Sequence, residues 1–164
     1  MLLRPRFPPT HDRRLDVADH VADTSSATDL GATDAVEAFY AAYNRHDAGA
    51  AAALYAEDGW HEEAHNGARR QGREALQTGL DRFFGFITHA HWQPRERIDA
   101  GASVAVVYTL TGVLGVDIKG LPTRGRPIEL RGVHLFDIVD GALRSTRDYW
   151  DPAAFQRQIA QVTA

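Results

Sequence analysis

Residues 61–65 read HEEAH, which matches the H-E-x-x-H pattern of zinc proteases. In that chemistry two histidines one helical turn apart hold a zinc ion, and the glutamate between them activates a water molecule. The segment is poorly suited to a helix, because the turn-forming pair Asn66-Gly67 follows at once. The longer form of the motif needs a further glycine and histidine, and Ala68 and Gln71 stand in those places. We therefore expect neither a bound metal nor protease activity.

The same five residues have a different meaning on an extended strand, where side chains alternate between two faces. His61, Glu63 and His65 would then share one face, and Glu62 and Ala64 would lie on the other. Imidazole and carboxylate groups on one face could orient a substrate or share in proton transfer. The alternative is a partly solvated rim without a chemical role.

A second histidine and carboxylate, His134 and Asp148, flank the turn signal Asp140-Gly141. A three-residue loop with Gly141 in the left-handed conformation would place them on one face of the hairpin, diagonally and within reach of each other. A two-residue loop would place them on opposite faces. Alternatively, Asp148 caps a terminus or pairs at the rim with a nearby arginine: Arg131, Arg144 or Arg147.

The remaining sequence predicts the elements that would position these side chains. Helical spacing of apolar residues predicts helices over residues 33–47, 48–58, 72–87 and 151–162. Thr33 or Asp34, Asp47 and Asp151 are their expected caps, and Pro152 suits a first helical position. Alternating patterns between turn signals predict strands over residues 59–67, 89–100, 103–118, 127–139 and 142–150.

Helices followed by an antiparallel meander and a final helix indicate an α+β fold with helices on one face of a curved sheet. Residues 1–30 are rich in Pro, Arg, Asp, Ser and Thr, and we expect a disordered or loosely docked arm there. Residues 31–164 are expected to form one domain, because the sequence contains no internal repeat and no linker after residue 30.

Two stretches, residues 39–60 and 130–152, resemble the SnoaL-like polyketide cyclases of the nuclear transport factor 2-like superfamily. The likeness extends from about residue 33 to residue 159. It implies a cone-shaped α+β barrel, with a curved and mostly antiparallel sheet wrapped around helices, and an apolar ligand pocket. It also implies an enzyme without a cofactor and a homodimer formed through the sheet. The superfamily includes members without catalysis, so the function must be argued from the site.

In SnoaL-like cyclases a histidine and an aspartate with this spacing form the catalytic pair. The resemblance therefore implies that Asp148 is the general base and His134 its neighbour. We expect burial to raise the pKa of Asp148, so that it can remove a proton from a carbon next to a carbonyl. His134 would then donate to the enolate oxygen.

The resemblance also implies a set of residues around the substrate. His61 and Glu63 would face Asp148 across the pocket. Tyr40 and Tyr43 would point into the cone as hydrogen-bond donors, or serve only as core residues. Trp150 shares the face of Asp148 on a strand and would form an aromatic wall.

The epoxide hydrolases of the superfamily also carry an aspartate in an Arg-Asp-Tyr context. They need an arginine and a second aspartate on the strand that corresponds to residues 109–113, where this chain has Thr111 and Val113 by our alignment. Epoxide hydrolysis of the usual type is therefore not expected.

Composition limits the remaining possibilities. The 164 residues are 44% hydrophobic and carry a net charge of −4, without a concentrated basic stripe, so we expect no nucleic-acid partner. The absence of cysteine excludes disulfides and thiol catalysis. The pair Arg13-Arg14 lacks the apolar stretch of an export signal, and no stretch is long enough to span a membrane, so we expect a cytoplasmic protein.

The expected function is a cofactor-independent cyclase or isomerase for a polyketide-like or other mostly apolar small molecule of natural-product biosynthesis. A dehydratase, an epoxide-opening cyclase, and a non-catalytic binding or dimerisation module remain alternatives. The state of Asp148 distinguishes them: a buried carboxylate without an arginine partner favours an enzyme.

Overall fold

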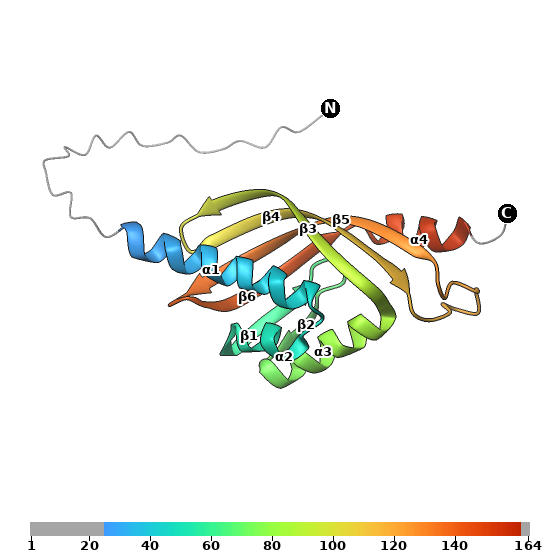
Figure 1. Cartoon of the computed structure of the whole chain (residues 1–164), viewed down its shortest axis with the longest axis horizontal. Helices are drawn as coiled ribbons and strands as arrows, with labels where there is room; N and C mark the ends of the chain where they lie inside the picture. The colour runs from blue at the N-terminus through green and yellow to red at the C-terminus, as the bar shows by residue number, and fades with distance from the viewer. Residues whose placement is uncertain (1–24, 162–164) are drawn as a thin grey trace, which may run out of the picture.

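The computed structural model describes the backbone of residues 25–161 and the side chains of residues 35–161. Its strands form one six-stranded curved sheet in the order β2-β1-β6-β5-β4-β3 (Figure 1). Within the described residues, β1 and β6 run parallel and the other neighbours are antiparallel. The elements are α1 (Ser25–Asn44), α2 (Ala48–Ala53), β1 (Tyr55–Glu63), β2 (Ala68–Gln71), α3 (Arg73–Phe86), β3 (Ile87–Ala100), β4 (Ser103–Leu114), β5 (Pro127–Val139), β6 (Ala142–Trp150) and α4 (Pro152–Ala160).

The predicted α+β fold is therefore confirmed, including the long antiparallel meander. Helices α1, α2 and α3 lie along one side of the bent sheet, and α4 lies at one end (Figure 1). The core fills the space between α1 and the sheet, where the ring of Phe39 packs on Tyr43 and against the edge of Phe136. No helix in the described part of the chain is long and apolar enough to cross a membrane.

Two predicted helix boundaries are wrong. Helix α1 begins at Ser25, before the predicted cap at Thr33 or Asp34. Helix α2 ends at Ala53, because the chain turns into β1 at Tyr55. The predicted arm, residues 1–30, lies largely outside the described residues, and its last residues belong to α1.

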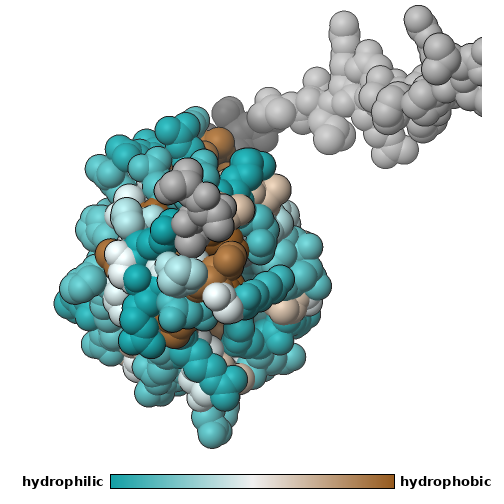
Figure 2. All heavy atoms as spheres, turned by 90° about the vertical axis from the view of Figure 1, so that its right-hand side faces the viewer, coloured by the Kyte–Doolittle hydropathy of each residue, from teal (hydrophilic) through white to brown (hydrophobic). Residues whose placement is uncertain are grey.

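Helices α2 and α4 begin as predicted. The Asp47 carboxylate accepts a hydrogen bond from the backbone N–H of Ala50 at 2.9 Å, and the Asp151 carboxylate accepts one from Ala153 at 2.8 Å. Helix α4 buries Phe155 and Ile159 against the sheet. The end of the molecule that carries α4 is otherwise largely hydrophilic, with hydrophobic side chains gathered near its middle (Figure 2).

The hairpin between β5 and β6 places His134 and Asp148 on one face, as predicted, but by a different route. The turn is a two-residue loop, Asp140-Gly141, with positive φ angles of 51° and 75°. A β-bulge at Arg144 then adds one residue to β6. Because one added residue reverses the alternation of faces, His134 and Asp148 become direct partners rather than diagonal neighbours.

Candidate functional site

His134 and Asp148 meet on the concave face of the sheet. The Nε2 atom of His134 lies 3.4 Å from Oδ2 of Asp148, and the two side chains are 1% and 14% exposed. No arginine among the described residues pairs with Asp148. The alternative of an ion pair with a rim arginine is therefore wrong for all three candidates: Arg131, Arg144 and Arg147.

Tyr108 on β4 is a further member of this group, and sequence reasoning missed it. Its hydroxyl donates to Oδ1 of Asp148 at 2.6 Å. The side chain reaches β6 across the intervening strand because its partner on β5 is Gly132. A Cβ atom at Gly132 would lie against the Tyr108 hydroxyl and 2.5 Å from its Cζ. A glycine inside a predicted strand was the available signal, because such a residue often marks a close approach.

Tyr40 contacts His134 rather than open space. Its hydroxyl and the Nδ1 atom of His134 are 2.9 Å apart and form a buried hydrogen bond. Burial, with a smaller contribution from the charge of Asp148, raises the pKa of Tyr40 well above its ordinary value, so the hydroxyl keeps its proton. The predicted inward orientation is correct, and the observed role of Tyr40 is to hold the histidine.

The pKa of Asp148 differs from our expectation. Burial alone would raise the pKa of this carboxyl. The charge and hydrogen bond of His134, the hydrogen bond from Tyr108 and the charge of His61 together outweigh burial and hold the pKa below its ordinary value. The expected raised pKa is therefore wrong for the unliganded protein, because these neighbours favour the ionised form.

A second histidine–carboxylate pair lies beside the first. Residues 61–63 end β1, so the helix required by the zinc-protease pattern is not formed. Parallel pairing with β6 makes Glu63 the backbone partner of Asp148. The His61 Nε2 atom lies 3.4 Å from a Glu63 oxygen, and Nδ1 is 2.8 Å from the Thr146 hydroxyl. Both predicted residues therefore line the site.

Glu63 is ionised more readily than an ordinary glutamate. Burial would raise its pKa, but the hydrogen bond and charge of His61, together with the indole of Trp150, lower it overall. Trp150 donates its Nε1–H to Glu63 at 2.9 Å, and its ring meets His65 with 4.7 Å between ring centroids. Trp150 is thus both the predicted aromatic wall and a hydrogen-bond donor.

Tyr43 lines the site from the α1 side. It hydrogen-bonds Tyr55, whose hydroxyl lies 2.6 Å from Oγ1 of Thr146. Burial, with smaller contributions from Tyr55 and the two carboxylates, raises the pKa of Tyr43. A chain of hydrogen bonds can therefore run from Tyr43 through Tyr55, Thr146 and His61 to Glu63, with each donor facing an acceptor.

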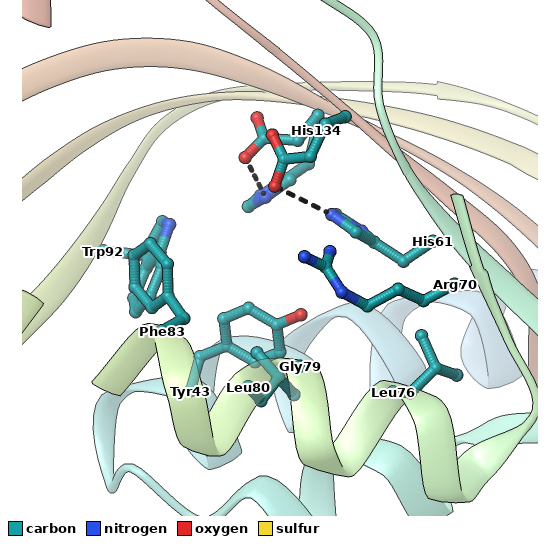
Figure 3. Close-up of a pocket in the computed structure, with 11 residues that line it drawn as sticks. Tyr43, His61, Arg70, Leu76, Gly79, Leu80, Phe83, Trp92 and His134 are labelled. Atoms are coloured by element: carbon teal, nitrogen blue, oxygen red, sulfur yellow. Dashed lines mark hydrogen bonds and ion pairs between the residues drawn. The ribbon is translucent and has the colours of Figure 1, made fainter. Parts of the chain in front are cut away.

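Two adjoining cavities lie between this group and the helices, with volumes of about 70 Å³ and about 160 Å³. Four residues line both cavities: Glu63, Phe83, Trp92 and Asp148. The smaller cavity adds His61, His134 and Tyr43 (Figure 3), and the larger is mostly apolar, with Leu110 and Phe155 in its wall. The two carboxylates thus lie where the more polar cavity meets the more apolar one.

Trp92 provides an unsatisfied polar group in the shared wall. Its indole Nε1 is buried and has no hydrogen-bond partner within the described part of the chain. A buried donor of this kind is uncommon in folded proteins. A ligand with an oxygen acceptor would satisfy it.

Several residues on β3 and β4 face away from the cavities. His89 and His91 are exposed on β3. Thr111 is also exposed, and with Val113 it takes the outward alternation of β4, so our alignment chose the wrong positions. The inward positions of that strand hold Tyr108 and Leu110. Neither Tyr108 nor Leu110 is the arginine or aspartate that the epoxide hydrolases need. Epoxide hydrolysis of the usual type is therefore still not expected.

Comparisons with known proteins agree with the fold. A model of the SnoaL-like domain matches residues 36–146. A solved structure from Xanthomonas campestris, assigned as a polyketide cyclase, has 32% identity and a TM-score of 0.66 over 84% of this chain and 100% of its own. A search of the curated proteins found no match.

Two further solved structures share the fold at lower identity. One is from Jannaschia sp. and is assigned as a SnoaL-like polyketide cyclase, with 17% identity and a TM-score of 0.73 over 85% of this chain and 98% of its own. The other is from Catenulispora acidiphila and has a ketosteroid isomerase-like fold, with 24% identity and a TM-score of 0.67 over 77% and 92%. The chain belongs to the SnoaL-like domain family, within the wider group of nuclear transport factor 2-like folds.

Proposed function

We propose that the protein is a cofactor-independent cyclase or isomerase that acts by general acid–base chemistry on a mostly apolar small molecule, such as a polyketide. Asp148 carries the proposal. Its carboxylate lines both cavities, has no arginine partner among the described residues, and is held by His134 and Tyr108. A buried carboxylate in a cleft, surrounded by titratable neighbours, is typical of a catalytic site and favours an enzyme over a binding module.

The reaction begins with removal of a proton. Asp148 takes the proton from a carbon next to a carbonyl, and the C–H electron pair forms the enolate C=C bond while the carbonyl oxygen becomes negative. A donor in the cavity, His134, stabilises that oxygen. In an isomerisation the proton returns to a different carbon. In a cyclisation the enolate carbon attacks a second carbonyl, and the resulting alkoxide receives the proton.

The lowered pKa of Asp148 is compatible with this role. A carboxylate with a low pKa is fully ionised at neutral pH and so available as a base. An apolar substrate would displace water from the cavity, and the added burial would raise the pKa during the reaction. The second pair, His61 and Glu63, lines the smaller cavity together with Asp148, and in this proposal it passes the proton to solvent or to a second substrate oxygen.

Proton removal can be measured before the natural substrate is known. We would follow hydrogen–deuterium exchange at the α-carbon of 2-tetralone, a two-ring ketone, by NMR in D₂O. The wild-type protein should accelerate exchange, and Asp148→Asn should lower that acceleration by roughly 10²–10⁴-fold, the usual effect of a positioned general base. His134→Ala should lower it by about 10²-fold, the effect of one oxyanion donor.

Asp81→Asn, at an exposed position on α3, is the matched control and should exchange like wild type. The variant pair should also be non-additive: Asp148→Asn with His134→Ala should lose less than the product of the single losses, because both act on one transition state. A folded Asp148→Asn protein with wild-type exchange would make Asp148 structural. No acceleration by the wild-type protein would argue against the proposed chemistry.

A further inference from the structure

Arg70 reaches from β2 into the smaller cavity. It lines that cavity together with His61 and Tyr43, and its guanidinium points toward the centre of the cavity in the close-up (Figure 3). Strand β2 is exposed along its length, so Arg70 connects the cavity with the outer surface. The sequence contained no sign of this role, because Arg70 is one of several arginines in a short polar segment.

Gly79 on α3 makes room for the Arg70 side chain. A Cβ atom at Gly79 would lie 2.5 Å from Cδ and 2.7 Å from Nε of Arg70. Any other residue would therefore displace the guanidinium, while Gly85 on the same helix has nothing within 4 Å of its Cβ position. The position of the Arg70 side chain against α3 thus depends on this glycine.

Arg70 is unlike the arginines on either side of it. Arg69 lies over the ring of Trp60, 3.8 Å from its centroid, and Arg73 donates to the backbone oxygen of Tyr55 at 2.9 Å. No group in the described part of the chain forms a hydrogen bond, ion pair or ring contact with the Arg70 side chain, whose backbone pairs with His61 in the sheet. A cation that lines a cavity without a partner is suited to an anionic ligand.

The carboxylates that line the cavity do not pair with the Arg70 guanidinium. Glu63 is bonded to His61 and Trp150, and the groups that lower the pKa of Asp148 include two histidines and Tyr108 but not Arg70. On the outer side, Arg70 shares a surface groove with Arg73, Arg82 and Glu74. This groove has a net positive charge, and it continues from Arg70 onto the outer surface.

We infer that Arg70 binds a carboxylate on an otherwise apolar ligand, and that Gly79 is a specificity residue because it admits the guanidinium to the cavity. The inference rests on the proposed function and names its substrate class: an apolar ring system with an acidic group at the entrance side. The planar guanidinium can hold a carboxylate through two parallel hydrogen bonds. The apolar body would then extend past Asp148 into the larger cavity.

Binding tests the inference without any need for turnover. We would measure the affinity of 2-naphthoate and its neutral counterpart 2-naphthamide by isothermal titration calorimetry. Wild-type protein should prefer naphthoate by about tenfold, the worth of one charge-assisted pair. Added salt should weaken the binding of naphthoate more than that of naphthamide. Arg70→Gln should remove the preference by weakening naphthoate alone.

Gly79→Ala should have the same effect as Arg70→Gln, and Gly85→Ala is its control on the same helix and should keep the preference. Circular dichroism would verify that each variant is folded. Equal affinity of the wild-type protein for the two compounds would overturn the carboxylate site and leave the acid–base proposal standing. If neither compound bound, the carboxylate site would be overturned, and the proposal that the cavity accepts apolar ligands would be contradicted as well. If both Arg70→Gln and Gly79→Ala kept the preference for naphthoate, the carboxylate would bind at a site other than Arg70.

Discussion

The imidazole of His134 is held on three sides. Tyr40 bonds its Nδ1 atom, Asp148 faces its Nε2 atom, and the ring of Tyr108 stacks on it with centroids 4.5 Å apart and 28° between the planes. A side chain held in this way does not have to reorganise when charge develops nearby. The tyrosines of this site therefore contribute by positioning the acid–base pair.

The lowered pKa of Asp148 predicts a specific pH dependence of stability. A carboxyl whose pKa is lower in the folded than in the unfolded protein stabilises the fold above its unfolded pKa, and this contribution disappears as the pH falls through the folded pKa. The wild-type protein should therefore lose free energy of unfolding below about pH 4, the ordinary aspartate range, more steeply than Asp148→Asn.

Urea denaturation of both proteins at a series of pH values measures this difference. Glu63 contributes to the acid loss in both proteins, because its pKa is also lowered, so only the difference between the two curves reports Asp148. Parallel curves through the acid range would show that the folded environment does not favour the carboxylate.

At the scale of elements, β5 determines which side chains from β4 and β6 can meet. Gly132 lets Tyr108 cross the strand, so Gly132→Ala should displace the hydroxyl from Asp148. We expect a loss of about 1–3 kcal/mol, the usual effect of overpacking a core. The added Cβ would also lie 2.5 Å from Cζ of Tyr108 and 2.8 Å from the backbone oxygen of Tyr149, and these contacts persist in a Tyr108→Phe background. The loss should still be smaller in that background, because no Tyr108–Asp148 hydrogen bond is left to break.

Chemical denaturation of the two single variants and the double variant measures this coupling as a double-mutant cycle. Gly85→Ala is the control for the added methyl group, since it has open space around it. Strict additivity of Gly132→Ala and Tyr108→Phe would mean that the glycine does not serve the Tyr108–Asp148 contact.

At the scale of the whole molecule, we propose that two copies associate through the outer face of the sheet. Val133 and Leu135 on β5 are only half-buried there, and Tyr149 on β6 is 46% exposed. Apolar side chains gathered on one sheet face are typical of an interface. Light scattering after gel filtration should therefore give twice the chain mass of 18.1 kDa.

Val133→Lys should shift the protein to the mass of a single chain, because a charge would be buried at the interface. Ala160→Lys, at an exposed position on α4, adds the same charge away from the sheet and should leave the mass unchanged. A wild-type protein that elutes as a single chain at all concentrations would contradict the proposed dimer.

The sequence alone determined the fold class, most of the strands and the caps at Asp47 and Asp151. These features depend on local periodicity and on hydrogen bonds between residues close in the chain, which a single sequence records directly. The shared face of His134 and Asp148 was also predicted, although the loop assumed for it was wrong. The bulge at Arg144 compensated for the shorter turn, and a bulge leaves no clear local signal.

Only the tertiary structure decided how the site is completed. Tyr108 reaches Asp148 across Gly132, and Arg70 enters the cavity over Gly79. Tyr108 and Asp148 lie 40 positions apart in the sequence, whereas Arg70 and Gly79 lie on the consecutive elements β2 and α3. Each contact depends on space left by a glycine on a neighbouring element. Such a contact is set by strand order, register and packing together. No local pattern of residues encodes strand order, register or packing. The acid–base pair could therefore be predicted, whereas the contact of Tyr108 with Asp148 and the entry of Arg70 into the cavity could not.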